Sequence, residues 1–266
     1  MAVRRQTPLT KRTIEASTCS LELKLRILRG LPFLSSLDEA AVRAVSGLFH
    51  EKGFGPEEFI YLAGSPANRL YAVADGAVKL IDRNQEGRGV VLDILGQGDF
   101  FGHFAGAPEE AYPHSAQAVT STCALVTSYR ELRQILTRYP AVAVDLLRVF
   151  AARLRSAQEQ VRRMSSDPVE MRIASALLRL AGRFGKREEP GMLIDLPLSR
   201  EALAEMSGTT TETASRIVTL LQREGAIRTG RQWVAIVDPA RLAVVAGNAP
   251  RRPVEAQDQN SSIYLH

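Results

Sequence analysis

The chain has 266 residues, of which 45% are hydrophobic and 24% charged, and its formal net charge is +5. This composition predicts a globular protein of one large or two modest domains, with no apolar run near the roughly 18 residues that a membrane span needs. The basic start, "MAVRRQTPLTKR", is not followed by the apolar stretch of a secretory signal. We therefore expect a cytoplasmic protein that has no membrane partner.

The positive charge is unevenly distributed along the chain. Residues 31–136 carry 8 Lys and Arg against 13 Asp and Glu, whereas residues 166–245 carry 11 against 10. The net charge therefore indicates a polyanionic partner only weakly. A DNA-binding function has to rest on particular residues in the C-terminal part.

The N-terminal part predicts a flexible tail followed by two helices. Residues 1–20 are polar and basic, without a lasting periodicity. A helical pattern then follows in "SLELKLRILRG", and Gly30 and Pro32 interrupt it. Ser36 is predicted to cap a second helix that continues through Leu48.

From about residue 50 to 128, short apolar runs of the β type alternate with glycine. The runs are "EFIYLAG", "LYAVA", "AVKLI", "VVLDIL" and "CALVTS". Glycines at 53, 64, 76, 87 and 98 recur every 11 or 12 residues, which favours an antiparallel barrel or jelly roll. Asp75-Gly76 predicts a tight hairpin turn, and "NQEGRG" predicts a longer one.

A long helix is predicted over residues 137–165. Its apolar residues are spaced alternately four and three apart, which is the seam of a coiled coil. This spacing favours a dimer seam over one face of a globular core. The seam consists of Ala143, Leu147, Phe150, Leu154, Ala157, Val161 and Met164.

Pro168 ends that helix, and Asp167 is predicted to cap the next one, "VEMRIASALLRLAGRF", which ends at Gly185. A polar loop, "KREEPGM", follows. Further on, Ser199 and Gly208 have the residue types that begin and end a helix over "REALAEMS".

The last part of the pattern predicts a helix from about 210 to 224, two strands around Thr229-Gly230 and a helix near 239–246. From residue 247 the composition predicts a disordered tail. Thr209 or Thr210 is expected to cap the helix near 210, and Thr209 with Glu212 also fits a capping box.

Two successive helices followed by a hairpin predict a winged helix-turn-helix. Apolar residues on facing sides of the two helices are expected to pack them together: Leu203, Met206, Ile217 and Leu221. The exposed N-terminal face of the second helix would then reach DNA. It carries Thr211, Glu212, Ser215 and Arg216.

In its order of parts, the sequence resembles the cyclic-AMP receptor and fumarate-nitrate-reduction regulator (CRP/FNR) family of bacterial transcription factors. The resemblance covers about residues 25–245, with the motifs "LGQGDFFG", "HSAQA" and "LSREALAEMSGTTTETASRIVTLLQREGAI". It implies an α+β fold with an N-terminal β-roll (a cyclic-nucleotide-binding-like jelly roll), a coiled-coil dimerisation helix and a C-terminal winged helix-turn-helix. The expected divisions are a tail over 1–20, the β-roll sensor domain over 21–136, the helix over 137–165, the DNA-binding domain over 166–246 and a tail over 247–266.

The family's base-reading pattern falls on Glu212, Ser215 and Arg216. Their chemistry agrees, because a guanidinium fits guanine, a carboxylate accepts from cytosine and a hydroxyl suits thymine. Ser at 215 resembles the fumarate-nitrate branch and implies a TTGA-type half-site. Further DNA contacts are expected from Thr210 and Thr211, from Ser199 and Arg200 at phosphates, and from Arg228 and Arg231 in the wing.

The sensor domain departs from the family's nucleotide-binding residues. His103 stands where the resemblance places a glutamate for the ribose, and His114 where it places an arginine for the phosphate, while Ser115 is retained. Ala157 and Gln158 replace the hydroxyl pair that meets adenine. These five residues are the candidate effector pocket, and their types argue against high-affinity cyclic-AMP binding, because a neutral imidazole does not replace a bidentate guanidinium.

Other cofactors are constrained by the cysteine and histidine content. An iron–sulfur cluster needs four thiolates, and the chain has only Cys19 and Cys123, so a 4Fe–4S cluster is excluded. A thiol switch between these two cysteines and a haem or metal bound by histidines such as His50 stay open as alternatives. So do another small ligand and no ligand at all.

Together, these observations predict a homodimeric, sequence-specific DNA-binding transcription regulator whose β-roll senses a signal and repositions the recognition helices on a palindrome. Double-stranded DNA, a second copy of the chain and RNA polymerase are the expected partners. A ligand-binding module whose helix-turn-helix serves protein contacts is an alternative from another class. An enzymatic reading finds no support, because no catalytic constellation or phosphate loop is present.

Overall fold

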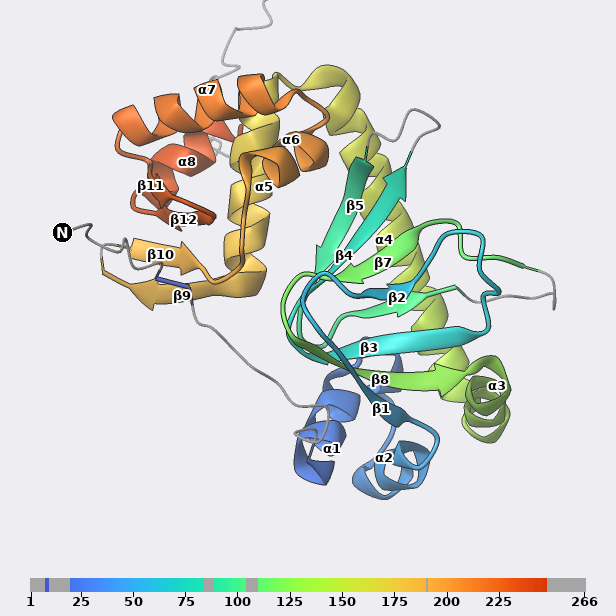
Figure 1. Cartoon of the computed structure of the whole chain (residues 1–266). Coiled ribbons are helices and arrows are strands. Elements are labelled where there is room, and N and C mark those ends of the chain that lie inside the picture. The colour runs from blue at the N-terminus through green and yellow to red at the C-terminus, as the bar shows by residue number, and fades with distance from the viewer. Residues whose placement is uncertain (1–7, 10–19, 84–88, 104–109, 190, 248–266) are drawn as a thin grey trace, which may run out of the picture.

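The computed structural model describes residues 8–9, 20–83, 89–103, 110–189 and 191–247. Figure 1 shows a β-roll with short helices at its base and one long helix along its side, which leads to a second, mostly helical domain. Among the described residues, none of the helices has the length and apolarity needed to cross a bilayer.

Three short helical elements lie around the N-terminal side of the roll. Helix α1 (Leu21–Gly30) is capped by Ser20, and the 3-10 helix η2 (Pro32–Leu34) follows. Helix α2 (Glu39–Ser46) is capped by Asp38, whose side chain accepts from the amide of Ala41. The prediction of Ser36 as its cap was wrong, because a carboxylate two residues later has the better position for the free amides.

The β-roll consists of two four-stranded antiparallel sheets, which confirms the predicted jelly roll. In spatial order, the first sheet contains β1 (His50–Phe54), β8 (Thr122–Ser128), β3 (Arg69–Asp75) and β6 (Phe100–Gly102), and the second contains β2 (Phe59–Tyr61), β7 (Ser115–Ala118), β4 (Val78–Arg83) and β5 (Gly89–Leu95). Strands β1, β6 and β7 had not been predicted, because they are short and lack an apolar run.

The predicted hairpin at Asp75-Gly76 was wrong. Strands β3 and β4 lie in different sheets, so this turn carries the chain from one sheet to the other. Gly76 does have a positive φ of 90°, and a Cβ on it would lie 2.5 Å from the carbonyl oxygen of Ser121. The glycine is therefore required by the turn and by the close approach of another backbone.

The hairpin predicted at "NQEGRG" is confirmed by its strands, because β4 pairs antiparallel with β5 from Val78↔Leu95 to Arg83↔Gly89. Its turn residues, 84–88, lie outside the described residues.

The region predicted as one helix from 137 contains the end of one helix and the start of another. Helix α3 (Tyr129–Arg138) begins with a capping box formed by Ser128 and Glu131. Helix α4 (Pro140–Ser166) begins at a proline in its first position. The break falls at Tyr139 because the residue before a proline disfavours the helical conformation.

The C-terminal domain opens with helix α5 (Val169–Phe184), whose N-cap is Pro168, without a side-chain cap. The prediction that Asp167 caps α5 was wrong: Asp167 is the C-cap of α4, and its carboxylate accepts from Ser166. Gly185 ends α5 as predicted, in extended rather than left-handed backbone.

A four-stranded sheet and three helices complete this domain. The sheet has the order β11 (Ile227–Gly230), β12 (Trp233–Ile236), β10 (Gly191–Ile194) and β9 (Gly185–Glu188), and the helices are α6 (Arg200–Ser207), α7 (Thr211–Arg223) and α8 (Pro239–Val245). Strand β9 replaces part of the predicted polar loop. The β11–β12 turn is at Arg231-Gln232, because Gly230 pairs with Trp233, and the predicted turn at Thr229-Gly230 was wrong.

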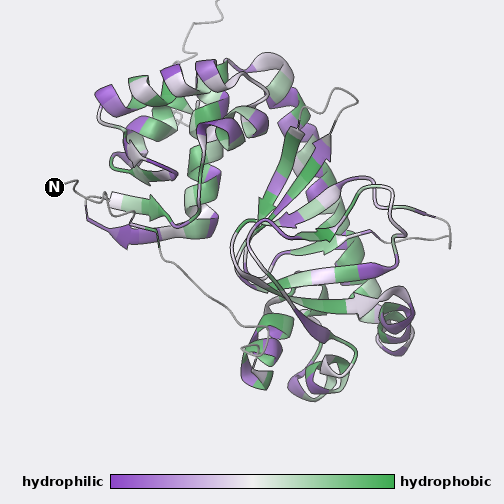
Figure 2. Ribbon diagram, in the orientation of Figure 1, coloured by the Kyte–Doolittle hydropathy of each residue, from purple (hydrophilic) through white to green (hydrophobic). Residues whose placement is uncertain are grey.

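The hydrophobic core divides into three clusters. One lies inside the roll and another lies between the roll and the N-terminal helices. The third fills the C-terminal domain and extends into the roll through Ala77, Val91 and Ile94. Figure 2 shows hydrophobic stretches along β4 and β5, and hydrophilic and hydrophobic residues alternating around α7.

Candidate DNA-binding surface

The helix-turn-helix consists of α6 and α7 and is defined by its caps. The Ser199 side chain accepts from the amide of Ala202 at 3.0 Å and begins α6. Gly208 ends α6 with φ 56° and ψ 49°, the left-handed conformation that lets the chain turn sharply toward α7. Both caps confirm the prediction from the sequence.

The four residues predicted to join the two helices are all buried, with exposed fractions between 0 and 8%. They are Leu203, Met206, Ile217 and Leu221, and they belong to one hydrophobic cluster. Because this cluster fixes α7 on α6, the position of the exposed α7 face is determined by the core of the domain.

The first turn of α7 is capped by Thr210, whose Oγ1 accepts from the amide of Thr213 at 3.2 Å. The Thr209–Glu212 capping box does not form, because the third residue of the helix is Thr213. Among the described residues, Glu212 has no hydrogen-bond or ion-pair partner. Its carboxylate is therefore available to a ligand, whereas the Thr210 hydroxyl already serves the helix end.

The surface of α7 near its N-terminus presents one carboxylate, one hydroxyl and one guanidinium. Thr211, Glu212 and Arg216 are exposed, and Ser215 is half-buried. Three or four residues apart on a helix, Glu212, Ser215 and Arg216 share one face. These groups have the donors and acceptors that read base edges in a major groove.

Arg200, for which a phosphate contact is predicted, also has a partner within the protein. Its Nη2 donates to the Thr229 Oγ1 at 3.1 Å, and that hydroxyl donates to the carbonyl of Trp233 at 2.9 Å. Burial lowers the pKa of Arg200. The guanidinium thus joins α6 to the wing, and the wing residues Arg228 and Arg231 are exposed. No local sequence pattern indicates the contact between Arg200 and Thr229.

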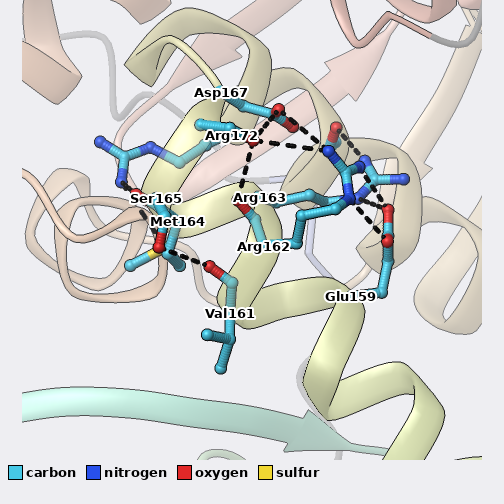
Figure 3. Close-up of polar contacts among 10 residues, drawn as sticks. Glu159, Val161, Arg162, Arg163, Met164, Ser165, Asp167 and Arg172 are labelled. Carbon is cyan, nitrogen blue, oxygen red and sulfur yellow. Dashed lines mark hydrogen bonds and ion pairs between the residues drawn. The ribbon is translucent and has the colours of Figure 1, made fainter.

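A dense polar network holds the corner between α4 and α5. Glu159 accepts from Arg162 at 2.7 Å and from Arg163 at 3.1 Å, and Arg172 donates to the carbonyl oxygen of Met164 at 3.1 Å (Figure 3). Met164 also lies against Gly208, where an added Cβ would be 2.3 Å from its Cε. The end of the long helix therefore touches the turn between α6 and α7.

The seam of α4 is largely uncovered in the single chain. Its exposed large apolar residues, with their exposed fractions, are Leu147 (68%), Phe150 (38%), Leu154 (61%), Val161 (67%) and Met164 (36%). Phe150 is less exposed because its ring packs edge-on against Phe100 of the roll. An apolar stripe of this length on an otherwise charged helix marks an interaction surface.

The candidate effector residues lie on two parts of the structure, with His103, His114 and Ser115 in the β-roll and Ala157 and Gln158 on α4. His103 pairs with Glu110 at 3.0 Å, and His114 shares a 3.2 Å hydrogen bond with the Tyr61 hydroxyl. The Ser115 hydroxyl accepts from the amide of Ala63. Ala157 and Gln158 are exposed on α4.

Aromatic rings fill the roll interior next to His114. The rings of Tyr61 and Tyr112 stack with their centroids 3.8 Å apart, and those of Tyr71 and Phe101 at 5.1 Å. Burial raises the pKa of Tyr61 and of Tyr112 and lowers that of His114. These tyrosines are separated by 10 to 51 positions in the sequence, so no local pattern indicated that they meet.

The remaining cofactor candidates are not brought together within the described residues. These residues contain no group of three or more His, Cys, Asp or Glu that could hold a metal ion. His50 pairs with Glu131 at 2.8 Å. Cys123 is buried in β8 and disulfide-bonded, and Cys19 lies outside the described residues.

The fold and this surface define a class: a DNA-binding protein in which one long helix joins a β-roll to a winged helix-turn-helix. Residues 51–139 match the cyclic nucleotide-binding domain, and residues 171–245 match the Crp-like helix-turn-helix domain. The chain is 30% identical over 219 residues to the cyclic AMP receptor protein of Thermus thermophilus, covering 82% of this chain and 98% of that one. The chain therefore belongs to the CRP/FNR family of transcription regulators.

Two further relatives agree with this assignment. A CRP-like cAMP-activated global transcriptional regulator of Mycobacterium tuberculosis is 29% identical over 217 residues, covering 82% of this chain and 97% of the relative. The structure of FixK2 from Bradyrhizobium japonicum superposes with a TM-score of 0.66 at 25% identity, covering 74% of this chain and 96% of FixK2. These matches are to regulators and not to enzymes, as the sequence predicted.

Proposed function

We propose that the protein is a homodimeric, sequence-specific transcription regulator that reads a TTGA-type palindrome through α7. The observation that carries this proposal is the free face of α7, where Glu212, Ser215 and Arg216 lie together on a helix whose opposite side is buried. Arg216 would donate to guanine and Glu212 would accept from cytosine. Thr211, Arg228 and Arg231 would add contacts at the edge of the same surface.

Two copies are required to read a palindrome. The exposed seam of α4 supports a two-fold dimer, because pairing two such helices would cover Leu147, Leu154 and Val161. A two-fold dimer would place two α7 helices in successive major grooves, with half-sites about 10 base pairs apart.

The experiment is a binding titration of the purified protein on a TTGA-type palindrome. Arg216→Ala should weaken binding by 10-fold or more and relax the preference at the guanine, because a bidentate contact contributes about 1–3 kcal/mol in each half-site. Arg223→Ala is the matched control, since it removes the same charge from the exposed far end of the same helix. Equal affinities of the two variants for the palindrome, or no preference of the wild type for the palindrome over scrambled DNA, would refute the proposal.

The β-roll is proposed to be the sensing part, through an effector that is not cyclic AMP. Two of the relatives are named for cyclic AMP, but here imidazoles occupy the positions of the expected acid and base, and both have protein partners. A calorimetric titration with cyclic AMP should show no binding at micromolar concentrations. The visible spectrum and metal content of the purified protein test the haem and metal alternatives directly.

RNA polymerase is the remaining proposed partner, because a transcription regulator of this family acts on a promoter. Transcription in vitro from a promoter that carries the palindrome should change when the protein is added, and Arg216→Ala should abolish that change.

A further inference from the structure

The β-roll and the DNA-binding domain are in direct contact, in addition to their connection through α4. Val91 and Ile94 of β5 belong to the same buried cluster as Leu177 of α5 and Leu203 of α6. Helix α6 packs against β5. The DNA-binding domain therefore rests on the roll, on the side away from the exposed face of α7.

Polar contacts at this interface include those between one arginine at the end of α5 and residues 93–100, which we call the junction turn. The Arg183 Nη1 donates to the carbonyl oxygen of Ile94 at 2.6 Å and to the Asp93 Oδ1 at 3.1 Å. Its Nε lies 3.7 Å from the Asp99 Oδ2. One guanidinium thus spans three acceptors on the junction turn, an arrangement that its planar fork of donors favours.

The junction turn also receives the long helix. Arg153 of α4 donates to the carbonyl oxygen of Phe100 at 2.6 Å and lies 3.8 Å over the Phe100 ring. Phe184 of α5 packs on Gly96 so closely that an added Cβ would lie 2.9 Å from the phenyl ring. Residues 95–100 of this turn belong to the "LGQGDFFG" motif, which takes no part in the DNA-binding surface described above.

We propose that Arg183 is a positioning residue for DNA recognition: it fixes the DNA-binding domain on the junction turn and thereby sets the orientation of α7. This inference rests on the proposed function. A domain free to rotate about the α4–α5 corner would present both recognition helices correctly in only a fraction of its orientations. Its apparent affinity for a palindrome would fall by that fraction, while its contacts with bases stayed the same.

The first test compares Arg183→Ala with Arg187→Ala on the palindrome. Both variants lose one arginine, and Arg187 is exposed on β9, away from the junction turn. Arg183→Ala should weaken binding about 10-fold, and Arg187→Ala should stay within about twofold of the wild type. Arg183→Lys should fall between them, because an ammonium retains the charge but loses the forked geometry.

The second test uses operators whose half-sites are moved apart by one or two base pairs. A fixed DNA-binding domain should bind the original spacing much more tightly than the altered spacings. In Arg183→Ala, the logarithm of this affinity ratio should be at most about half of its wild-type value. A residue that only stabilised the fold would lower affinity for all spacings equally. If Arg183→Ala binds more tightly than the wild type, or matches Arg187→Ala in both affinity and spacing preference, the positioning role is overturned.

A measurement without DNA separates this inference from the proposed function. In scanning calorimetry the wild type should unfold with the DNA-binding domain and the roll coupled, whereas in Arg183→Ala the DNA-binding domain should unfold as an earlier, separate transition. If the wild type binds no palindrome but the two calorimetric profiles differ, the proposed function fails and Arg183 keeps only a role in joining the two domains. Identical calorimetric profiles for the wild type and Arg183→Ala would overturn the junction.

Discussion

The α4 seam gives the most quantitative prediction, through Leu154→Ala. Leu154 is 61% exposed in the single chain, and a dimer seam would cover it. Truncation removes three carbon groups, each of which contributes about 0.8 kcal/mol when fully buried. Scaled by the exposed fraction of Leu154, the truncation should remove about 1.5 kcal/mol of dimerisation free energy in each protomer.

Because a two-fold dimer has two copies of Leu154 in its seam, the expected loss is about 3 kcal/mol, which raises the dimer dissociation constant about 150-fold. Sedimentation equilibrium over a range of concentrations measures this constant. Arg155→Ala is the control, since Arg155 is also exposed on α4 but lies outside the seam.

Leu154→Ala should therefore become monomeric at concentrations where the control remains dimeric, and its affinity for a palindrome should fall in parallel. A dimer constant equal to that of Arg155→Ala would refute the assignment of the seam. A monomeric wild type would refute the dimer itself.

Three other predictions follow from the described contacts. Gly208→Ala should lower the free energy of unfolding by about 1–2 kcal/mol in urea titrations, because φ 56° disfavours a Cβ and Met164 occupies its space. Burial raises the pKa of Glu131, but hydrogen bonds from Ser128 outweigh it and hold the pKa at about 2, so its contribution to stability should be complete above about pH 4.5 and lost as the pH falls toward 2. The stability difference between the wild type and Glu131→Gln should shrink over that window. DNA affinity should fall as the salt concentration rises. The plot of log K against log salt concentration should have a slope much shallower than about −10, because the wing has two arginines, Arg228 and Arg231, and Arg200 already donates to Thr229.

The helix-turn-helix could be predicted in detail because its signals are local. Ser199 and Gly208 are recognisable as caps from their residue types and spacing, and the structure confirms both. The seam of α4 is visible for the same reason, since every third or fourth residue of a helix returns to the same side. Each of these features lies within a few turns of one helix.

The wrong caps were local errors of a residue or two, whereas other errors arose where contacts distant in sequence decide the conformation. Asp75-Gly76 has the composition of a hairpin turn, but β3 pairs with β8 and β6 instead of β4, so the same glycine serves a crossing between sheets. Likewise, nothing near His114 in the sequence indicates that Tyr61 would bond to it. Similarly, no sequence pattern distinguishes Arg183 from the other helical arginines, because its partners on the junction turn lie about 90 positions away in the sequence.

The near-neutral charge of the C-terminal domain makes orientation decisive. A strongly basic domain would bind DNA through its overall field and could tolerate an imprecise approach. Residues 166–245 contain 11 basic and 10 acidic residues, so under the proposed function the affinity would come from a few correctly placed groups on α7. Two contacts outside the helix-turn-helix bear on that placement: Met164 at Gly208, from the end of the seam, and Arg183 at the junction turn. We therefore expect a change in either the proposed dimer seam or the roll to alter DNA affinity without altering any of the residues proposed to contact bases.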